Sequence, residues 1–192
     1  MGDFASYLNI FVTLFSILNP IGIIPLFLAI TADHSTDQKK STIKNTIIAV
    51  LLILLLSAYV GNYLLSFFGI DIDSFRIAGG ILLLLMAINM LQAKIPSTKT
   101  NEKEQNEAIE KEDISIVPLA IPLIAGPGAI STVILFSSSM PYMIDKVVLG
   151  IVIIFTSLLL WPILRLSKPI GEYLGRTGLN ISTRIMGLIL AA

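Results

Sequence analysis

Helix-breaking residues lie in the middle of the first long apolar run of this sequence, where a membrane-spanning helix would be most regular. The run covers residues 4–30 and contains the motif Asn19-Pro20-Ile21-Gly22. Proline lacks an amide hydrogen and clashes with the preceding helical turn, and glycine weakens a helix further. A backbone group freed in hydrocarbon finds no water, so such a break must be buried in protein or line a cavity. The motif is therefore the leading candidate for a functional site.

The composition is that of a membrane protein. Of the 192 residues, 55% are hydrophobic and 14% are charged, and the mean hydropathy is +0.86. Soluble domains carry about 25% charged residues. A net charge of zero gives no basic surface for nucleic acid, and the lack of cysteine excludes disulfides and thiolate metal sites. No histidine, cysteine or acidic pair lies at membrane depth, so we expect no enzyme, no catalytic residue, no metal site and no cofactor.

A membrane-spanning helix needs roughly 20 apolar residues. The sequence predicts five such helices and the beginning of a sixth, over residues 4–30, 43–68, 75–91, 114–137 and 147–166 and from Arg184 onward. The first run is long enough for two half-helices around its break. The last run is too short to cross a bilayer at about 1.5 Å per residue, so we expect the natural chain to continue beyond Ala192.

The basic residues predict an orientation. All lysines and arginines except Arg76 and Lys146 lie in or beside the first, third and fifth connections between the predicted spans. Positive residues favour the cytoplasmic side of a membrane. We therefore expect these three connections in the cytoplasm and the N-terminus outside. The third connection is the one extended polar segment of the chain and is expected to be a flexible linker.

Three short motifs recur in the same order in the two halves of the chain. The matched pairs are Pro20 and Gly22 with Gly126-Pro127-Gly128, VGNYL at 60–64 with IGEYL at 170–174, and RIAGGIL at 76–82 with RIMGLIL at 184–190. Each half holds three predicted spans, so the second half must enter the membrane in the opposite sense. This is an inverted-topology repeat, an architecture found in many secondary transporters.

The expected fold is therefore an all-α membrane protein with six transmembrane helices in two inverted three-helix repeats. The first helix of each repeat is expected to be broken, at residues 19–22 and at residues 126–128. Residues 1–192 form one transmembrane domain, which comprises repeat one (1–93), a cytoplasmic linker (94–113) and repeat two (114–192), with the sixth helix incomplete.

The two breaks have the chemistry of a binding site. A broken helix presents amides that suit an anion and carbonyls that suit an ammonium group or a small cation, and a zwitterionic amino acid would use both. Either motif alone is more often a simple kink, and serine and threonine often bond between membrane helices. Recurrence in both halves favours a site. The predicted substrate-binding residues are Ser16, Asn19, Pro20, Gly22, Gly126, Pro127, Gly128, Ser131 and Thr132.

Three longer motifs resemble those of the MarC family of bacterial and archaeal integral membrane proteins. They are NPIGIIPLF at 19–27, FRIAGGILL at 75–83 and VPLAIPLIAGPGAIST at 117–132, and the resemblance covers essentially the whole chain. The family is similar to the LysE-type amino-acid exporters. The resemblance implies a six-helix protein of the bacterial or archaeal cytoplasmic (inner) membrane that transports small neutral amino acids, and a sixth helix that continues past Ala192.

We therefore expect a multi-pass transporter, an exporter or exchanger, of small neutral amino acids such as alanine or glycine. It would work by alternating access around the paired broken helices. Two alternatives stay open: a small-solute or ion channel that uses backbone carbonyls at the same breaks, and an accessory membrane protein without a transported ligand. The expected partners are the amino acid, the lipid bilayer, a coupling ion and, in a homo-oligomer, a second copy of the chain. No particular residue indicates the coupling ion or the second copy. Nucleic acid is not expected.

Overall fold

A computed structural model describes residues 4–92 and 124–192, and within these ranges the chain is helical without a β-strand. The expected all-α class is confirmed. The helices are α1 (Phe4–Leu18), α2 (Ile24–Ile30), α3 (Thr36–Phe67), α4 (Ile72–Leu91), α6 (Pro127–Ser138), α7 (Met143–Arg165) and α8 (Ser167–Ala191).

Three of the described helices, α3, α4 and α7, are long and apolar enough to cross a membrane. With 32 residues, α3 is about 48 Å long at 1.5 Å per residue, which exceeds the hydrocarbon thickness of a bilayer. Helices α1 and α6 are apolar but shorter. The expectation of a protein with several membrane-spanning helices is confirmed, whereas six spans in two inverted repeats stay a prediction.

The helix that contains the predicted second span is longer than that span, because polar residues extend the helix outward. Helix α3 begins at Thr36 and not at Ile43, since Ser35 and Gln38 form a capping box. The Ser35 hydroxyl accepts a 3.3 Å bond from the Gln38 amide, and the Gln38 side chain accepts a 2.8 Å bond from the Ser35 amide. Hydropathy marks the part of a helix that suits hydrocarbon, whereas caps decide where the backbone bonds begin.

The helix that contains the last predicted span also begins earlier than that span. Helix α8 starts at Ser167 and not at Arg184, and it bends at Gly175, where φ is 60° and ψ is −177°. Gly69, between α3 and α4, has a φ of 68°. Left-handed φ values of this kind favour glycine. A glycine of positive φ therefore precedes the final helical segment in each half of the chain.

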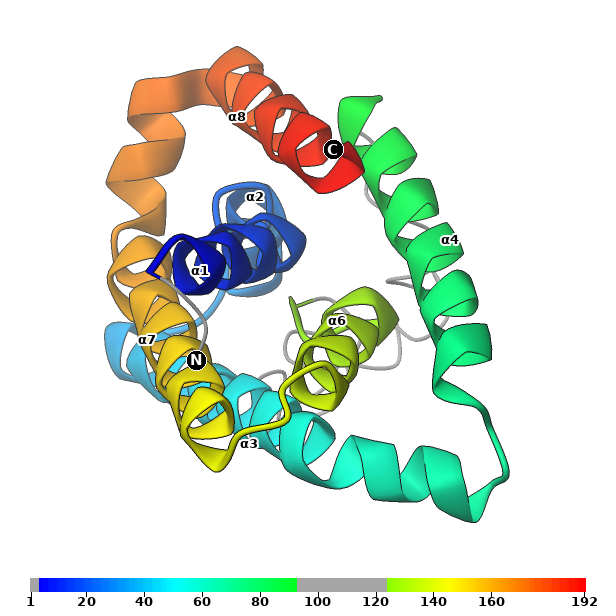
Figure 1. Cartoon of the computed structure of the whole chain (residues 1–192). Coiled ribbons are helices and arrows are strands. Elements are labelled where there is room, and N and C mark those ends of the chain that lie inside the picture. Colours follow the sequence, from blue (N-terminus) through cyan, green and yellow to red (C-terminus); the bar gives the residue numbers. More distant parts are fainter. Residues whose placement is uncertain (1–3, 93–123) are drawn as a thin grey trace.

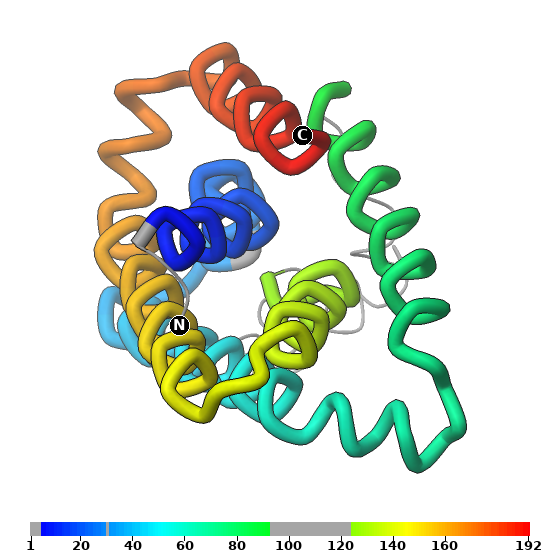
Figure 2. Tube along the Cα trace, viewed as in Figure 1, coloured from blue at the N-terminus to red at the C-terminus, as the bar shows by residue number. Residues whose placement is uncertain are grey.

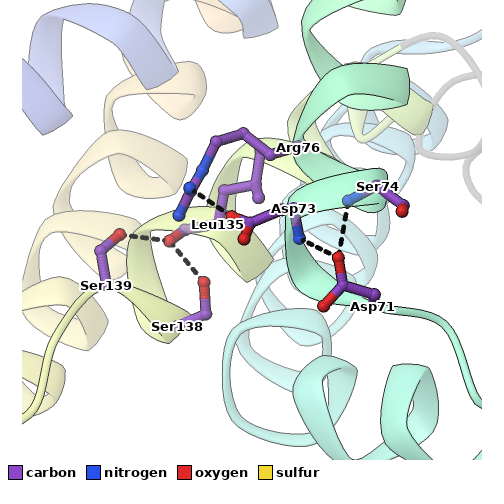
Figure 3. Close-up of polar contacts among 7 residues, drawn as sticks. All are labelled: Asp71, Asp73, Ser74, Arg76, Leu135, Ser138 and Ser139. Carbon is purple, nitrogen blue, oxygen red and sulfur yellow. Dashed lines mark hydrogen bonds and ion pairs between the residues drawn. The ribbon is translucent and has the colours of Figure 1, made fainter.

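Side-chain bonds define the start of α4, which lies beside the end of α6 in Figure 3. The Asp71 carboxylate accepts bonds from the amides of Asp73 and Ser74 at 3.0 and 3.1 Å. Arg76 pairs with the Asp73 carboxylate at 2.7 Å, while the serines that end α6 bond to a carbonyl of their own helix. The ion pair is exposed and contributes little to stability, but the cap defines the start of the helix.

Helices α1, α2 and α6 lie inside a ring formed by α3, α4, α7 and α8, as Figure 1 shows. The tube in Figure 2 follows the same course. The most extensive packing joins helices of different halves: α4 with α8 and α6, α3 with α6 and α7, and α1 with α7 and α8. This set of contacts maps onto itself when α1, α3 and α4 are exchanged with α6, α7 and α8.

Contacts near the helix ends show which connections share a side. Tyr7 in α1 bonds to the first turn of α7, and the Tyr59 hydroxyl of α3 donates to the Lys146 carbonyl at 2.9 Å. The start of α1, the end of α3 and the start of α7 therefore lie together. Lys40 near the start of α3 and Arg165 at the end of α7 line one groove on the other side. This alternation agrees with the expected order of connections, and the absolute orientation stays a prediction.

A buried apolar cluster joins the inner helices to the ring. Leu14 and Ile17 of α1, Leu54 of α3, Ala129 of α6 and Ile153 of α7 belong to it, and each is at most 1% exposed. Many large apolar side chains of α3, α4, α7 and α8 are instead exposed on the molecule. In a membrane protein these side chains face lipid, which is as apolar as they are.

Candidate functional site

The first break covers residues 19–23, between α1 and α2. Asn19 has a φ of 46°, a left-handed conformation that asparagine tolerates better than most residues. Its side-chain oxygen accepts a 3.2 Å hydrogen bond from the Gly22 amide, which closes the turn. The next residue, Pro20, is buried and has no amide hydrogen, so the Ser16 carbonyl loses the donor that a continuous helix would supply.

The first break packs against α8. A Cβ atom on Gly22 would overlap the Asn19 side chain and would lie 2.7 Å from the Thr183 hydroxyl oxygen. Ser16 is 1% exposed, and its hydroxyl lies 3.7 Å from the Met186 sulfur, a weak acceptor. The structure thus brings the predicted residues of the first half together, and it places them beside the last helix of the second half.

The second break lies directly before α6. Gly126 is the N-cap of α6 in an extended conformation, and Pro127 occupies the start of that helix, where a missing amide hydrogen is tolerated. Pro127 and Gly128 are therefore the first two residues of α6. The discontinuity within the described residues is at 125–126, and the half-helix expected before it lies outside the described residues except for its last helical residue, Ile124.

The start of α6 combines free backbone donors with little space. Its N-cap, Gly126, offers no side chain, so the amides of Gly128 and Ala129 are among the first-turn donors without an intrahelical acceptor. Gly126 and Gly128 are buried, whereas Pro127 is exposed. A Cβ atom on Gly128 would overlap the sulfur of Met86 in α4. A side chain at this position would therefore displace the Met86 side chain.

Two predicted polar residues of α6 are buried. Ser131 is 5% exposed and faces α4, because a Cβ atom on Gly79 would lie 3.3 Å from the Ser131 Cβ. Thr132 is 4% exposed, and its hydroxyl has no hydrogen-bond partner in the described part of the chain. Burying a hydroxyl without a partner costs free energy. Thr132 is thus the predicted residue with unused hydrogen-bonding capacity.

The predicted site residues form two groups that border one core. The group at the first break faces α8, the group at the start of α6 faces α4, and α1 and α6 contact each other. Ile17 and Leu18 beside the first break share a buried cluster with Ile124 and Ala125 beside the second. Among the described residues, no hydrogen bond joins the polar atoms of the two groups. A single shared site stays a prediction.

Sequence reasoning did not single out the partners of the two groups, Met86, Thr183 and Met186. Met186 lies within the repeated motif that begins at Arg184, and Thr183 directly precedes that motif. Their place in or beside the repeated motif was the one feature of the sequence that could have identified these two residues. Which side chain meets a glycine from another helix depends on packing, which the repeat alone does not specify.

A buried carboxylate also escaped sequence reasoning. Asp145 in the first turn of α7 is 5% exposed and accepts a 2.6 Å bond from the Tyr7 hydroxyl. The two residues line a cavity of about 440 Å³ between α1, the end of α6 and the start of α7, together with Ser6, Asn9 and Ser139. Asp145 lies just before the predicted fifth span, where an acidic residue ordinarily faces water. Its burial is visible only in the tertiary structure.

Comparison with known proteins relates the whole chain to one group of membrane proteins. The sequence pattern of the family described as "MarC family integral membrane protein" matches residues 4–192. A UPF0056 membrane protein of Buchnera aphidicola subsp. Schizaphis graminum is 43% identical over 190 residues, 99% of this chain and 88% of its own. The UPF0056 membrane protein YhcE of Escherichia coli is 40% identical over 193 residues, again 99% and 88%. A UPF0056 membrane protein of Methanocaldococcus jannaschii is 42% identical over 186 residues, 97% and 82%. No solved structure matches.

Proposed function

Because the chain belongs to the MarC family of integral membrane proteins, we propose that it transports small neutral amino acids, such as alanine or glycine, across the cytoplasmic membrane. The protein would act as an exporter or exchanger. The observation that carries the proposal is the central place of the two helix discontinuities. Both lie inside the ring of Figure 1, and both border the same buried cluster. Irregular backbone at membrane depth is tolerated where it is buried in protein or lines a cavity.

The backbone at the two discontinuities suits a zwitterion. The first-turn amides of α6, at Gly128 and Ala129, favour a carboxylate, and the Thr132 hydroxyl lies one turn further along the same helix. The Ser16 carbonyl, freed by Pro20, favours an ammonium group. Side chains of the protein closely approach Gly22 and Gly128, so a substrate bound beside them would have to be small and would displace these side chains. These features support alanine and glycine over larger amino acids.

In the proposed transport path, the cavity beside Tyr7 and Asp145 is the outer end. It lies on the side of the start of α1, which the basic residues predict to be outside the cell. A buried carboxylate next to a tyrosine hydroxyl attracts the ammonium group of an amino acid. In the proposed cycle this cavity receives or releases substrate on the outside, and the two discontinuities bind it near the midplane.

Alternating access would follow from two inverted three-helix repeats. Two observations support this architecture: the most extensive helix contacts map onto themselves when the halves are exchanged, and Gly69 and Gly175 occupy equivalent places before the final segments. In transporters built from inverted repeats, one repeat rocks against the other around a fixed binding site, which exposes the site to each side in turn. The proposal includes the N-terminus outside the membrane and assigns no catalytic step to the chain.

The proposal is tested by counterflow in proteoliposomes that contain the full chain. Vesicles loaded with unlabelled alanine are diluted into a trace of labelled alanine, and the label inside is followed with time. A carrier gives saturable uptake that unlabelled alanine on the opposite side stimulates, and glycine competes for it. Uptake without saturation and with unitary conductance would instead indicate a channel. Folded protein that gives no flux in either assay would overturn the proposal.

A further inference from the structure

A groove of about 480 Å³ lies on the outer surface of the ring, between the N-terminal part of α3 and the C-terminal part of α7. These two helices lie side by side in Figure 1. Lys40, Lys44 and Arg165 line the groove, and all three are exposed. Trp161 and Leu158 line it from α7 and are 47% and 54% exposed, so the groove is open to the medium that surrounds the protein.

The basic side chains gather at one end of the groove. Lys40 and Lys44 are four residues apart and share one face of α3. The Arg165 guanidinium lies 5.0 Å from the centre of the Trp161 ring, a cation–π contact that holds it over the groove. Lys40 also pairs with Asp37 at 2.9 Å, but the two side chains are 62% and 91% exposed. Such a pair is weak, so the lysine can turn to another anion at little cost.

The rest of the groove is apolar. Isoleucines of α3, among them Ile47, lie opposite Leu158 of α7 and continue the groove away from the basic end. A free anion in water would gain nothing from this apolar floor, and an uncharged acyl chain would gain nothing from three cations. One kind of molecule that surrounds a membrane protein has both parts, an anionic headgroup and an acyl chain. Tryptophan and snorkelling basic side chains are typical of the level at which headgroups lie.

We propose that this groove binds an anionic phospholipid of the surrounding bilayer. Lys40, Lys44 and Arg165 hold its phosphate, and one acyl chain lies on the apolar floor between α3 and α7. The guanidinium bonds to phosphate oxygens through two nitrogens, and the lysines act as point charges. The basic end lies where the positive residues predict the cytoplasmic side, which is the leaflet rich in anionic lipid. The inference depends on membrane residence and not on the transported substrate.

Trp161 makes the proposal directly testable, since it is the single tryptophan of the chain. The full chain is reconstituted in phosphatidylcholine vesicles that contain a small fraction of lipid with brominated acyl chains, which quench tryptophan on contact. The brominated lipid is phosphatidylglycerol in one arm and phosphatidylcholine in the other. We expect several-fold stronger quenching per mole by the phosphatidylglycerol, with the preference weakening as salt is added.

Two triple variants that remove the same charge separate lipid binding in the groove from general attraction between basic residues and anionic lipid. In the groove variant Lys40→Gln, Lys44→Gln and Arg165→Gln are combined. In the control variant Lys168→Gln, Arg176→Gln and Arg184→Gln remove the same charge from exposed positions of α8. We expect the control to keep the preference for phosphatidylglycerol and the groove variant to quench equally with both lipids.

A second readout covers a groove variant that folds poorly. Phosphatidylglycerol added to the wild-type protein in detergent should raise its thermal unfolding midpoint more than phosphatidylcholine does, because a ligand of the folded state stabilises it. Equal quenching by both lipids in the wild type would overturn the proposal, and so would an equal loss of preference in the two variants. Inorganic phosphate that raises the midpoint as much as the lipid would exclude a role for the acyl chain.

Discussion

The hydroxyl of Tyr7 in α1 donates a 2.6 Å hydrogen bond to the carboxylate of Asp145 in α7. The bond joins the first helix of one half to the second helix of the other, within a ring whose packing is dominated by contacts between halves. Because Asp145 is 5% exposed, its carboxylate must be compensated inside the protein. The Tyr7 hydroxyl is one of the groups that do so.

Replacing Tyr7 by phenylalanine should lower the free energy of unfolding by about 1.5–3 kcal/mol, the range for a hydrogen bond to a charged group. The ring stays in place, so lost packing contributes little. Tyr173→Phe is the matched control, because Tyr173 is 91% exposed. Denaturation of both variants in the same detergent measures the difference. Equal stabilities would show that the bond contributes nothing.

Alanine at Gly187 should destabilise the packing of α8 on α4. The new Cβ would lie 2.8 Å from the Met90 Cβ and 3.1 Å from the Ala87 carbonyl oxygen, and a backbone atom cannot rotate away as a side chain does. We expect a cost of about 1–3 kcal/mol, the range for overpacking.

Gly80 provides the control for Gly187, because a Cβ there would meet nothing within 4 Å. Gly80→Ala should be neutral or stabilise the protein by up to about 1 kcal/mol through helix propensity. Thermal unfolding of the two variants compares them directly. The packing would be more adaptable than the structure indicates if both alanines had the same effect.

Substitutions of Asn19 should follow the demands of its backbone. Leucine at a φ of 46° is strained by about 1–3 kcal/mol and also loses the bond to the Gly22 amide. Glycine relieves the backbone strain but cannot make the hydrogen bond to the Gly22 amide. Aspartate keeps a side-chain oxygen that can accept this bond. We expect the unfolding midpoint to be highest for the aspartate variant, lower for the glycine variant and lowest for the leucine variant. We also expect the leucine variant to lose counterflow of alanine. A leucine variant with normal flux would remove the first break from the proposed path.

Thr132→Val should separate a binding role from a structural one. The Thr132 hydroxyl is buried and has no partner in the described part of the chain, so valine should leave stability unchanged or raise it by up to about 1 kcal/mol. We expect a lower affinity for alanine in counterflow, because the unused donor would be lost.

Thr156→Val is the comparison for this substitution, since the Thr156 hydroxyl donates a 2.7 Å bond to the Val152 carbonyl. It should cost up to about 1 kcal/mol of stability and leave transport intact. If the Thr132→Val variant transported alanine with wild-type affinity, Thr132 would have a packing role and no binding role.

Much of the helix content could be predicted because it depends on local chemistry. Apolar runs identified α3, α4 and α7, and the missing amide hydrogen of Pro20 marked the first break. The ends of helices were less predictable, since the capping box of Ser35 and the bend at Gly175 lie in polar segments that hydropathy excludes. The missing amide hydrogen of proline also does not specify one structure. Pro20 lies in the break after α1, whereas Pro127 is the first residue of α6.

The sequence by itself determined that this is a helical membrane protein of the MarC family with a discontinuity in its first helix. These properties follow from composition, from motif identity and from backbone groups that hydrocarbon cannot satisfy. Only the tertiary structure decided that the first break faces α8, that Gly128 faces α4, that Asp145 is buried beside Tyr7, and that Lys40 and Arg165 share a groove. The physical reason is that these pairings join residues far apart in the chain. They depend on how whole helices pack, which no local pattern specifies.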